Sequence, residues 1–158
     1  MSPSGQVVAL SCSGVLSDAD PTPRSAIVLL DATVRPPVEI KRFAAATQLG
    51  APLGFTVAYA SDGTLVGVAL GDTMAGRNDV AYTLDVASGT AQVLLDGGAA
   101  FVLGDVNCAP GCTDLCAVAD ANANVLRLWK ASGSSLAPQP SVPVDPNIGL
   151  PPRSIGTY

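Results

Sequence analysis

GFTVAYASDGTLVGVALG at residues 54–71 and DVAYTLDVASGTAQVLLD at residues 79–96 form the most regular stretch of the chain. Each segment contains two apolar runs of strand length joined by a short turn rich in Gly, Ser and Asp. Glycine supplies the positive φ that tight hairpin turns need, so Ser61-Asp62-Gly63 and Ser88-Gly89 predict hairpins. We therefore predict that Gly54 to Asp96 form one four-stranded antiparallel meander.

The rest of the chain aligns on this four-stranded unit. On its amino-terminal side, three apolar runs predict three strands, at residues 6–12, 26–31 and 38–44. On its carboxyl-terminal side, runs at residues 99–105, 114–120 and 125–130 are followed by a segment at 136–144. Proline recurs in this last segment, which predicts an edge strand or an extended polyproline-like stretch. The two complete units start near Phe55 and Ala100, a period of about 45 residues that is typical of propeller blades.

The alignment divides the 158 residues into about three units within a single domain, residues 1–158. Residues 6–44 match the second to fourth strands of a unit, residues 54–96 and 99–144 are complete units, and residues 153–158 are a leftover first strand. Three blades do not close a ring, because propellers need about four or more. We therefore expect Ser154 to Tyr158 to complete the unit of residues 6–44, within the chain or in a partner chain.

Two such chains would form a six-bladed ring as a homodimer. The other interpretation is that the chain is one part of a longer propeller, without an activity of its own.

The segment Val80 to Thr90, together with the Ser61-Asp62-Gly63-Thr64 turn, resembles the blade repeat of the YVTN, NHL and lactonase-like β-propellers. In these families an apolar strand, an Asp-Gly turn and a second apolar strand precede a strand that ends in Asp before a turn of small residues. Asp31, Asp85 and Asp120 each end an apolar strand here, although their spacing is unequal. The resemblance implies an all-β, propeller-like array of four-stranded antiparallel meander blades.

Lactonase-like propellers hold a metal in the central channel with Asp and Asn side chains, and the resemblance implies corresponding positions in this chain. These positions are Asp72, Asn78, Asp79, Asp105 and Asn107. Asp and Asn are also ordinary turn residues, and we expect most of these five to serve as such. We accordingly expect no cofactor, with Ca²⁺ as the alternative.

Composition narrows the functional classes. The chain has eight basic and 13 acidic residues, a net charge of −5 and no basic cluster, which argues against nucleic-acid binding. No apolar run approaches the roughly 18 residues that would span a bilayer. Histidine, the commonest general base and metal ligand, is absent, and no nucleophile elbow, P-loop or dinucleotide motif occurs. We therefore favour a non-enzymatic binding or scaffolding module with a protein or glycan ligand over a metal-dependent hydrolase.

Four cysteines, Cys12, Cys108, Cys112 and Cys116, allow three disulfide pairings. Cys108-Ala-Pro-Gly-Cys112 brackets a turn, so we predict a disulfide from Cys108 to Cys112 or Cys116. The spacing fits no common zinc motif. Disulfides persist in oxidising compartments, which predicts an extracellular or periplasmic protein. The Met-Ser-Pro-Ser start lacks the features of a signal peptide, so we expect that the native amino terminus lies further upstream.

Overall fold

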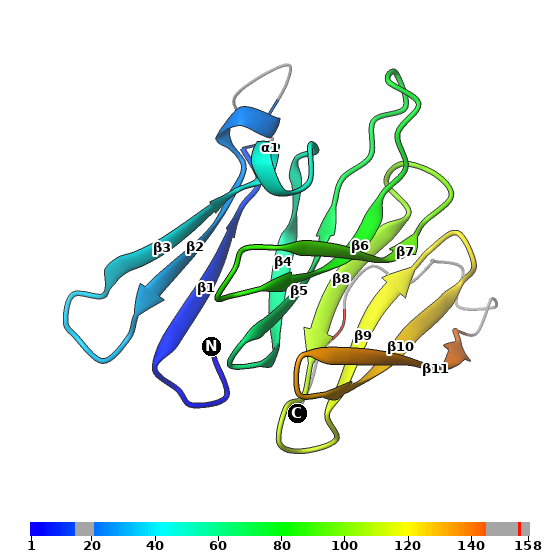
Figure 1. Ribbon diagram of the computed structural model, residues 1–158. Helices are drawn as coiled ribbons and strands as arrows, with labels where there is room; N and C mark the ends of the chain where they lie inside the picture. The colour runs from blue at the N-terminus through cyan, green and yellow to red at the C-terminus, as the bar shows by residue number, and fades with distance from the viewer. Residues whose placement is uncertain (15–20, 145–154, 156–158) are drawn as a thin grey trace.

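Three antiparallel sheets make up the protein in a computed structural model, which describes residues 1–14, 21–144 and 155 (Figure 1). Sheet 1 contains β1 (Val7–Cys12), β2 (Ala26–Asp31) and β3 (Val38–Ala44). Sheet 2 contains β4 (Leu53–Ser61), β5 (Thr64–Ala69), β6 (Val80–Asp85) and β7 (Ala91–Asp96). Sheet 3 contains β8 (Leu103–Cys108), β9 (Leu115–Asp120), β10 (Val125–Ser132) and β11 (Ser135–Pro143). Two short helices, η1 (Thr22–Arg24) and α1 (Ala45–Gln48), complete the described elements.

Each sheet is a meander in which consecutive strands pair. The strands of sheet 2 occupy the apolar runs of residues 54–96, as the sequence predicts, and the all-β class is confirmed. The Pro-rich segment forms β11, which lies at the edge of sheet 3. A proline is tolerated there because an edge strand has a row of N–H groups that need no partner in the sheet.

Aspartates at strand ends close the hairpins. Asp31 accepts hydrogen bonds from the backbone N–H (2.8 Å) and hydroxyl (2.6 Å) of Thr33, and Asp85 accepts the same pair from Ser88 at 2.6 and 2.7 Å. These bonds favour the ionised carboxylates, so they lower the pKa of both Asp31 and Asp85. Asp120 accepts the N–H of Ala123 in the same way. The three aspartates that end apolar strands in the sequence therefore have a local, structural role in turns.

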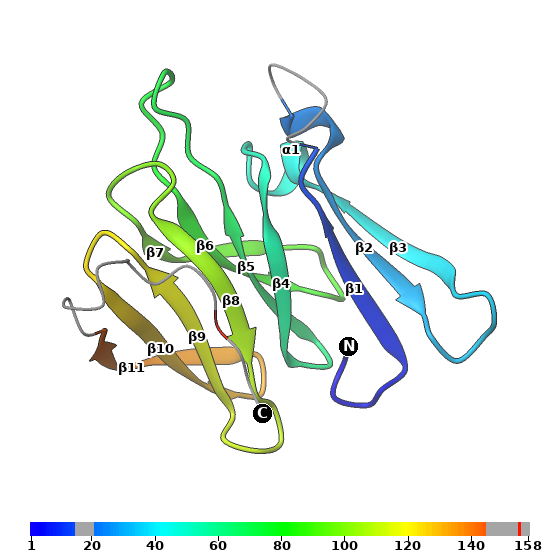
Figure 2. The same ribbon diagram turned by 180° about the vertical axis from the view of Figure 1, so that it is seen from behind.

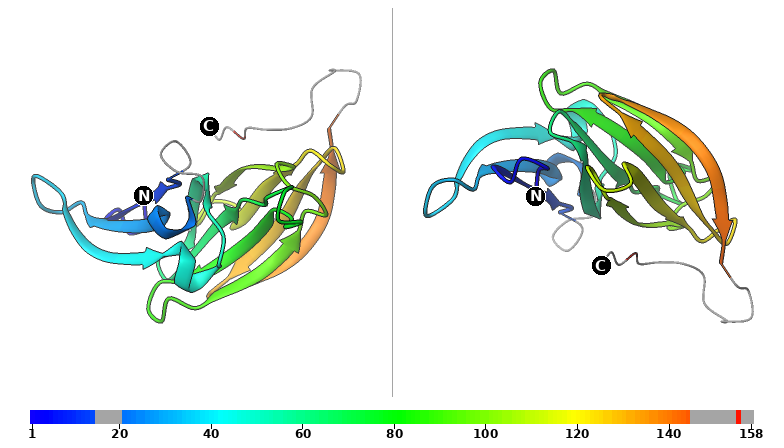
Figure 3. Two further views of the ribbon diagram at one scale, coloured as in Figure 1. Left: turned by 90° about the horizontal axis from the view of Figure 1, so that it is seen from above. Right: turned by 90° about the horizontal axis from the view of Figure 1, so that it is seen from below.

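Sheet 2 lies between the other two sheets and packs on each of them with one face (Figure 3). It has two apolar faces because successive side chains of a strand point to opposite sides of the sheet. One face packs on sheet 1 through Leu65, Tyr82 and Leu84 against Ile27, Leu29 and Phe43. The opposite face packs on sheet 3 through Val66, Val68 and Ala81 against Cys116, Val118 and Trp129. The molecule therefore has two apolar cores, one on each side of sheet 2.

Gly67 permits the close packing of Tyr82 inside the first core. The two residues are paired across β5 and β6, and a Cβ at position 67 would lie 2.5 Å from the Tyr82 hydroxyl oxygen. Burial raises the pKa of Tyr82, so its hydroxyl stays neutral in the core. A side chain of any size at position 67 would displace this ring.

The first strands of the three sheets, β1, β4 and β8, lie side by side, and the remaining strands extend outward from them (Figure 2). The Ser11 hydroxyl donates to the carbonyl of Gly54 (2.6 Å), and the N–H of Val106 donates to the Thr56 hydroxyl oxygen (3.0 Å). β1 has the position of a first strand in sheet 1, because it lies beside β4 as β4 lies beside β8. The sequence alignment instead matches β1 with the second strand of a unit. The surface along which β1, β4 and β8 lie side by side, which we call the inner surface, is thus built from one strand of each sheet.

Of the predicted leftover strand, residues 153–158, the structure describes Ile155 alone. Its N–H donates to Asp105 (3.1 Å), and its carbonyl accepts a hydrogen bond from the Asn107 amide (3.4 Å). Ile155 therefore lies against β8 of its own chain. The pairing that we predict for Ser154 to Tyr158 with the first unit otherwise lies outside the described residues.

A disulfide joins Cys108 and Cys116, which face each other across β8 and β9 with Cα atoms 4.0 Å apart. This is one of the two pairings that the sequence predicts for Cys108. Cys12 and Cys112 are free and exposed. The bond closes the β8–β9 hairpin at the end where its long loop begins.

We predict that Ellman's reagent counts two thiols in the denatured protein before reduction and four after reduction. Replacing both Cys108 and Cys116 by Ser should lower the free energy of unfolding by about 2 kcal/mol, because the bond restrains the unfolded chain over a short loop. The control is Cys112→Ser, which should change it by less than about 0.5 kcal/mol, because Cys112 is free and exposed. Four reactive thiols before reduction would contradict the pairing.

Candidate functional site

An inner groove of about 500 Å³ lies where β1, β4 and β8 meet. Its polar side chains come from all three strands: Ser11 from β1, Thr56 from β4, and Asp105 and Asn107 from β8. Ser11 and Thr56 also link neighbouring sheets through the hydrogen bonds described above. The groove therefore exists only because the three sheets are joined along their first strands.

A second hollow of about 320 Å³, which we call the aromatic hollow, adjoins the groove between β4 and β8. Its lining residues are Gly54, Phe55, Thr56, Leu70, Phe101, Leu103, Gly104 and Asp105. Phe55 is 73% exposed and Phe101 is 57% exposed, although aromatic side chains of this size usually contribute to a core. Phe55, Thr56 and Asp105 line both cavities, so the groove and the hollow share a wall.

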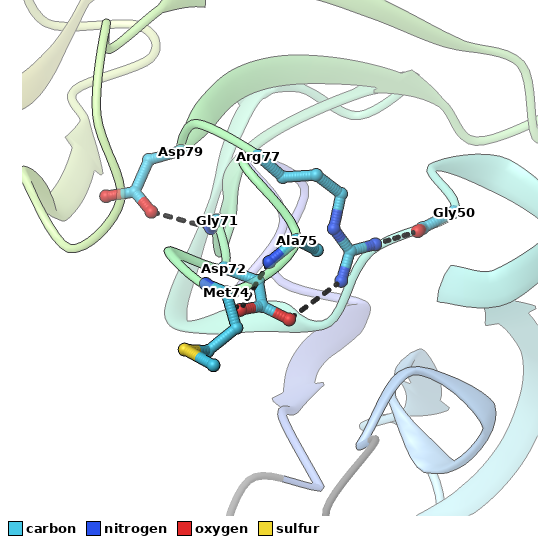
Figure 4. A network of polar contacts seen from close by, with 7 residues as sticks. All are labelled: Gly50, Gly71, Asp72, Met74, Ala75, Arg77 and Asp79. Carbon is cyan, nitrogen blue, oxygen red and sulfur yellow. Dashed lines mark hydrogen bonds and ion pairs between the residues drawn. The ribbon is translucent and has the colours of Figure 1, made fainter.

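Asp79 fixes the segment that carries Phe101. Its carboxylate is fully buried and accepts hydrogen bonds from the N–H groups of Gly71 (2.7 Å), Val102 (2.7 Å) and Leu103 (2.8 Å). Its own N–H donates to the carbonyl of Ala99. The linker between β7 and β8 is therefore tied to the loop between β5 and β6, and Figure 4 shows the Gly71 end of this contact.

Phe101 itself has a φ of 60°, a left-handed conformation that a bulky side chain rarely adopts. The two residues that follow it are the ones whose N–H groups Asp79 holds. Such a conformation persists where the surroundings impose it, and it commonly occurs at functional sites. The backbone thus presents the ring on the surface of the hollow.

Asp72 caps the tip of the β5–β6 loop. It accepts the N–H groups of Met74 (2.8 Å) and Ala75 (3.2 Å) and forms an ion pair with Arg77 at 3.7 Å (Figure 4). Arg77 also donates to the carbonyl of Gly50 (2.8 Å). Asn78 donates to Asp96 at 2.8 Å. These contacts organise the loop and use the polar groups that the sequence marked as metal candidates.

The predicted metal positions therefore separate into two places. Asp105 and Asn107 lie together on β8 in the inner groove, whereas Asp72 and Asp79 lie in the β5–β6 loop. Across residues 1–14, 21–144 and 155, no group of three or more His, Cys, Asp or Glu side chains is arranged to hold a metal ion. A Ca²⁺ site remains a prediction from the resemblance alone.

Sequence reasoning missed both phenylalanines of the aromatic hollow. Phe55 lies in an apolar run that reads as a core strand, and Phe101 follows the small residues of a linker. Nothing in the local pattern distinguishes Phe55 from Phe43, which is 5% exposed. Both residues lie on edge strands, but Phe43 packs into the core between sheets 1 and 2, whereas Phe55 belongs to neither core.

A scan against protein-family models and searches of curated proteins and of solved structures returned no match to this chain. The site is therefore interpreted from its own geometry. No helix in the described part of the chain has the length and apolar character needed to cross a bilayer.

We predict that Asp79→Ala lowers the free energy of unfolding by at least about 3 kcal/mol, because three buried N–H groups lose a charged acceptor. Asp72→Ala is the matched control, since Asp72 belongs to the same loop but is exposed, and it should cost less than about 1 kcal/mol. Urea denaturation followed by circular dichroism measures both values. Equal losses for the two variants would contradict the anchoring role of Asp79.

Proposed function

We propose that this chain is a non-enzymatic binding or scaffolding module of an exported bacterial protein, built as part of a propeller. The observation that carries the proposal is the stack of three meander sheets with their first strands side by side and with outer faces that no other described strand covers. Such a stack offers a rigid frame with an inner surface formed by several sheets. Loops and grooves on a frame of this kind are common places for binding.

The outer face of sheet 1 supports closure by further sheets. Ile27 and Leu29 point toward sheet 2, so Val28 and Leu30 point away from it, and Leu10 is paired with Val28 in the register of β1 and β2. Leu10 is 44% exposed, and Cys12 on the same side of β1 is also exposed. Val28 is already buried at 5% exposure, so the apolar surface that this proposal uses is at Leu10 on β1. Exposed apolar surface of this kind marks an interaction site.

The other end of the stack presents a different apolar face. In sheet 3, Cys116 and Val118 point toward sheet 2, so Leu115 and Ala117 of β9 point away from it. We propose that a second copy places this face of its sheet 3 on sheet 1 of the first copy, and that the reciprocal contact closes a six-bladed ring. If the chain is instead one part of a longer propeller, the remainder of that longer chain would supply the sheets that complete the ring.

Two further observations support the proposal. The Cys108–Cys116 disulfide agrees with an oxidising compartment, as an exported protein requires. Asp79, one of the residues considered for a channel metal, already accepts three backbone N–H groups in a buried position. The hydrolase alternative would therefore need a ligand set that does without Asp79.

We predict that the chain of 15.8 kDa has twice this mass in multi-angle light scattering at micromolar concentration. Leu10→Asp should shift the mass to that of a monomer, because it places a charge on the apolar face of sheet 1. Met74→Asp is the control, since Met74 is 95% exposed on a loop far along the chain from this face and should leave the mass unchanged. A monomeric mass for the unchanged chain would contradict the homodimer.

A further inference from the structure

We propose that the aromatic hollow binds an organic cation, namely an ammonium or guanidinium group such as a Lys or Arg side chain of a peptide. The inference gives a ligand class to the binding role proposed above and rests on that role. It does not depend on ring closure, because β4, β8 and the linker before β8 build the hollow within one chain.

The lining of the hollow favours a small group that contacts aromatic side chains. Phe55 and Phe101 are largely exposed, and Gly54 and Gly104 contribute lining without side chains. Leu70 and Leu103 supply the remaining apolar lining. At about 320 Å³ the hollow is at the small end of ligand sites, which suits a side chain better than a large ligand.

The charge of the hollow selects the sign of the ligand. Asp105 is the one charged residue among its described lining residues, and none of them is Lys or Arg. The faces of the two phenylalanine rings are electronegative and attract a cation within about 6 Å of the ring centroid. A ligand anion would be repelled, and a neutral apolar ligand would remove water from Asp105 without pairing its charge.

Asp105 retains the capacity to bind such a cation. Its Oδ1 accepts the N–H of Val106 (3.0 Å) and its Oδ2 accepts the N–H of Ile155 (3.1 Å). A carboxylate has about four acceptor positions, so each oxygen can accept one more hydrogen bond. The two existing bonds hold the carboxylate in place for a charged donor.

The aromatic side chains are positioned before any ligand arrives. Phe101 is presented by a left-handed residue whose following N–H groups are fixed by buried Asp79, and Phe55 lies on β4. Fixing these groups on folding reduces the ordering cost on binding. The chain already contains a contact of the same chemistry, because the Lys41 ammonium lies 5.0 Å from the centroid of the Phe43 ring.

The test compares two probes of nearly equal shape, N-acetyl-L-arginine amide and N-acetyl-L-citrulline amide, by titration of the full chain followed in amide NMR spectra. Citrulline replaces the guanidinium by a neutral urea. We expect the arginine probe to shift the amide signals of Phe55, Phe101 and Asp105 and to bind at least about tenfold more tightly than the citrulline probe. Equal affinities, or no shifts with about 20 mM arginine probe, would overturn the proposal.

Two variants test which side chains provide the affinity for the arginine probe. Phe55→Leu keeps an apolar side chain but removes the ring, and it should weaken the arginine probe about fivefold with little effect on the citrulline probe. Asp105→Asn should weaken the arginine probe about tenfold. Val93→Ala is the control, because Val93 is similarly exposed on β7 but does not line the hollow. Unchanged arginine affinity in both Phe55→Leu and Asp105→Asn would overturn the assignment.

Light scattering on the same samples separates this inference from the proposed function. Phe55 lies outside the terminal faces, so Phe55→Leu should keep the mass of the unchanged protein. A dimer that does not bind the arginine probe would refute the cation site alone. A monomer that binds the probe would refute ring closure alone.

Discussion

The buried carboxylate of Asp79 is the interaction on which the rest of the structure depends. It accepts one N–H from the β5–β6 loop and two from the segment that enters β8. A buried charge is stable only where several donors compensate for the lost water, and three backbone donors provide this compensation. Because Gly71 follows β5 of sheet 2 and Leu103 begins β8 of sheet 3, their shared acceptor sets where sheet 3 begins relative to sheet 2. The second apolar core and the aromatic hollow both follow from that placement.

The strands and their order within each sheet could be predicted because the signals are local. Apolar runs of strand length define β4 to β7, and Gly and Asp at the ends of the runs define the hairpins. The position of β1 beside β4 could not be read in this way. A period of two tells which residues share a face of a sheet, but it does not tell which other sheet covers that face. Inter-sheet bonds such as Ser11 to Gly54 join residues far apart in the sequence, and no local pattern encodes them.

The site was predictable only where its residues are polar. Asp105 and Asn107 stand out in a strand and do lie in the inner groove. Asp79 and its neighbours look equally polar in the sequence, yet Asp79 is buried and Asp72 is exposed. The phenylalanines also look alike in the sequence, yet Phe43 is buried and Phe55 is exposed. Burial is a property of the assembled sheets, so residue type alone cannot separate the buried positions from the exposed ones.

The terminal faces and the aromatic hollow have different physical origins. No described strand packs on the outer face of sheet 1, where Leu10 is exposed although Val28 is buried, and we propose that a sheet with a matching apolar surface covers Leu10. The hollow is complete within one chain, and its chemistry combines aromatic faces with a carboxylate. The proposed assembly and the proposed ligand binding therefore use different residues, although Leu10 and Phe55 both line the inner groove. They are also linked through sheet 2, which packs on sheet 1 with one face and, through Asp79, holds the start of sheet 3.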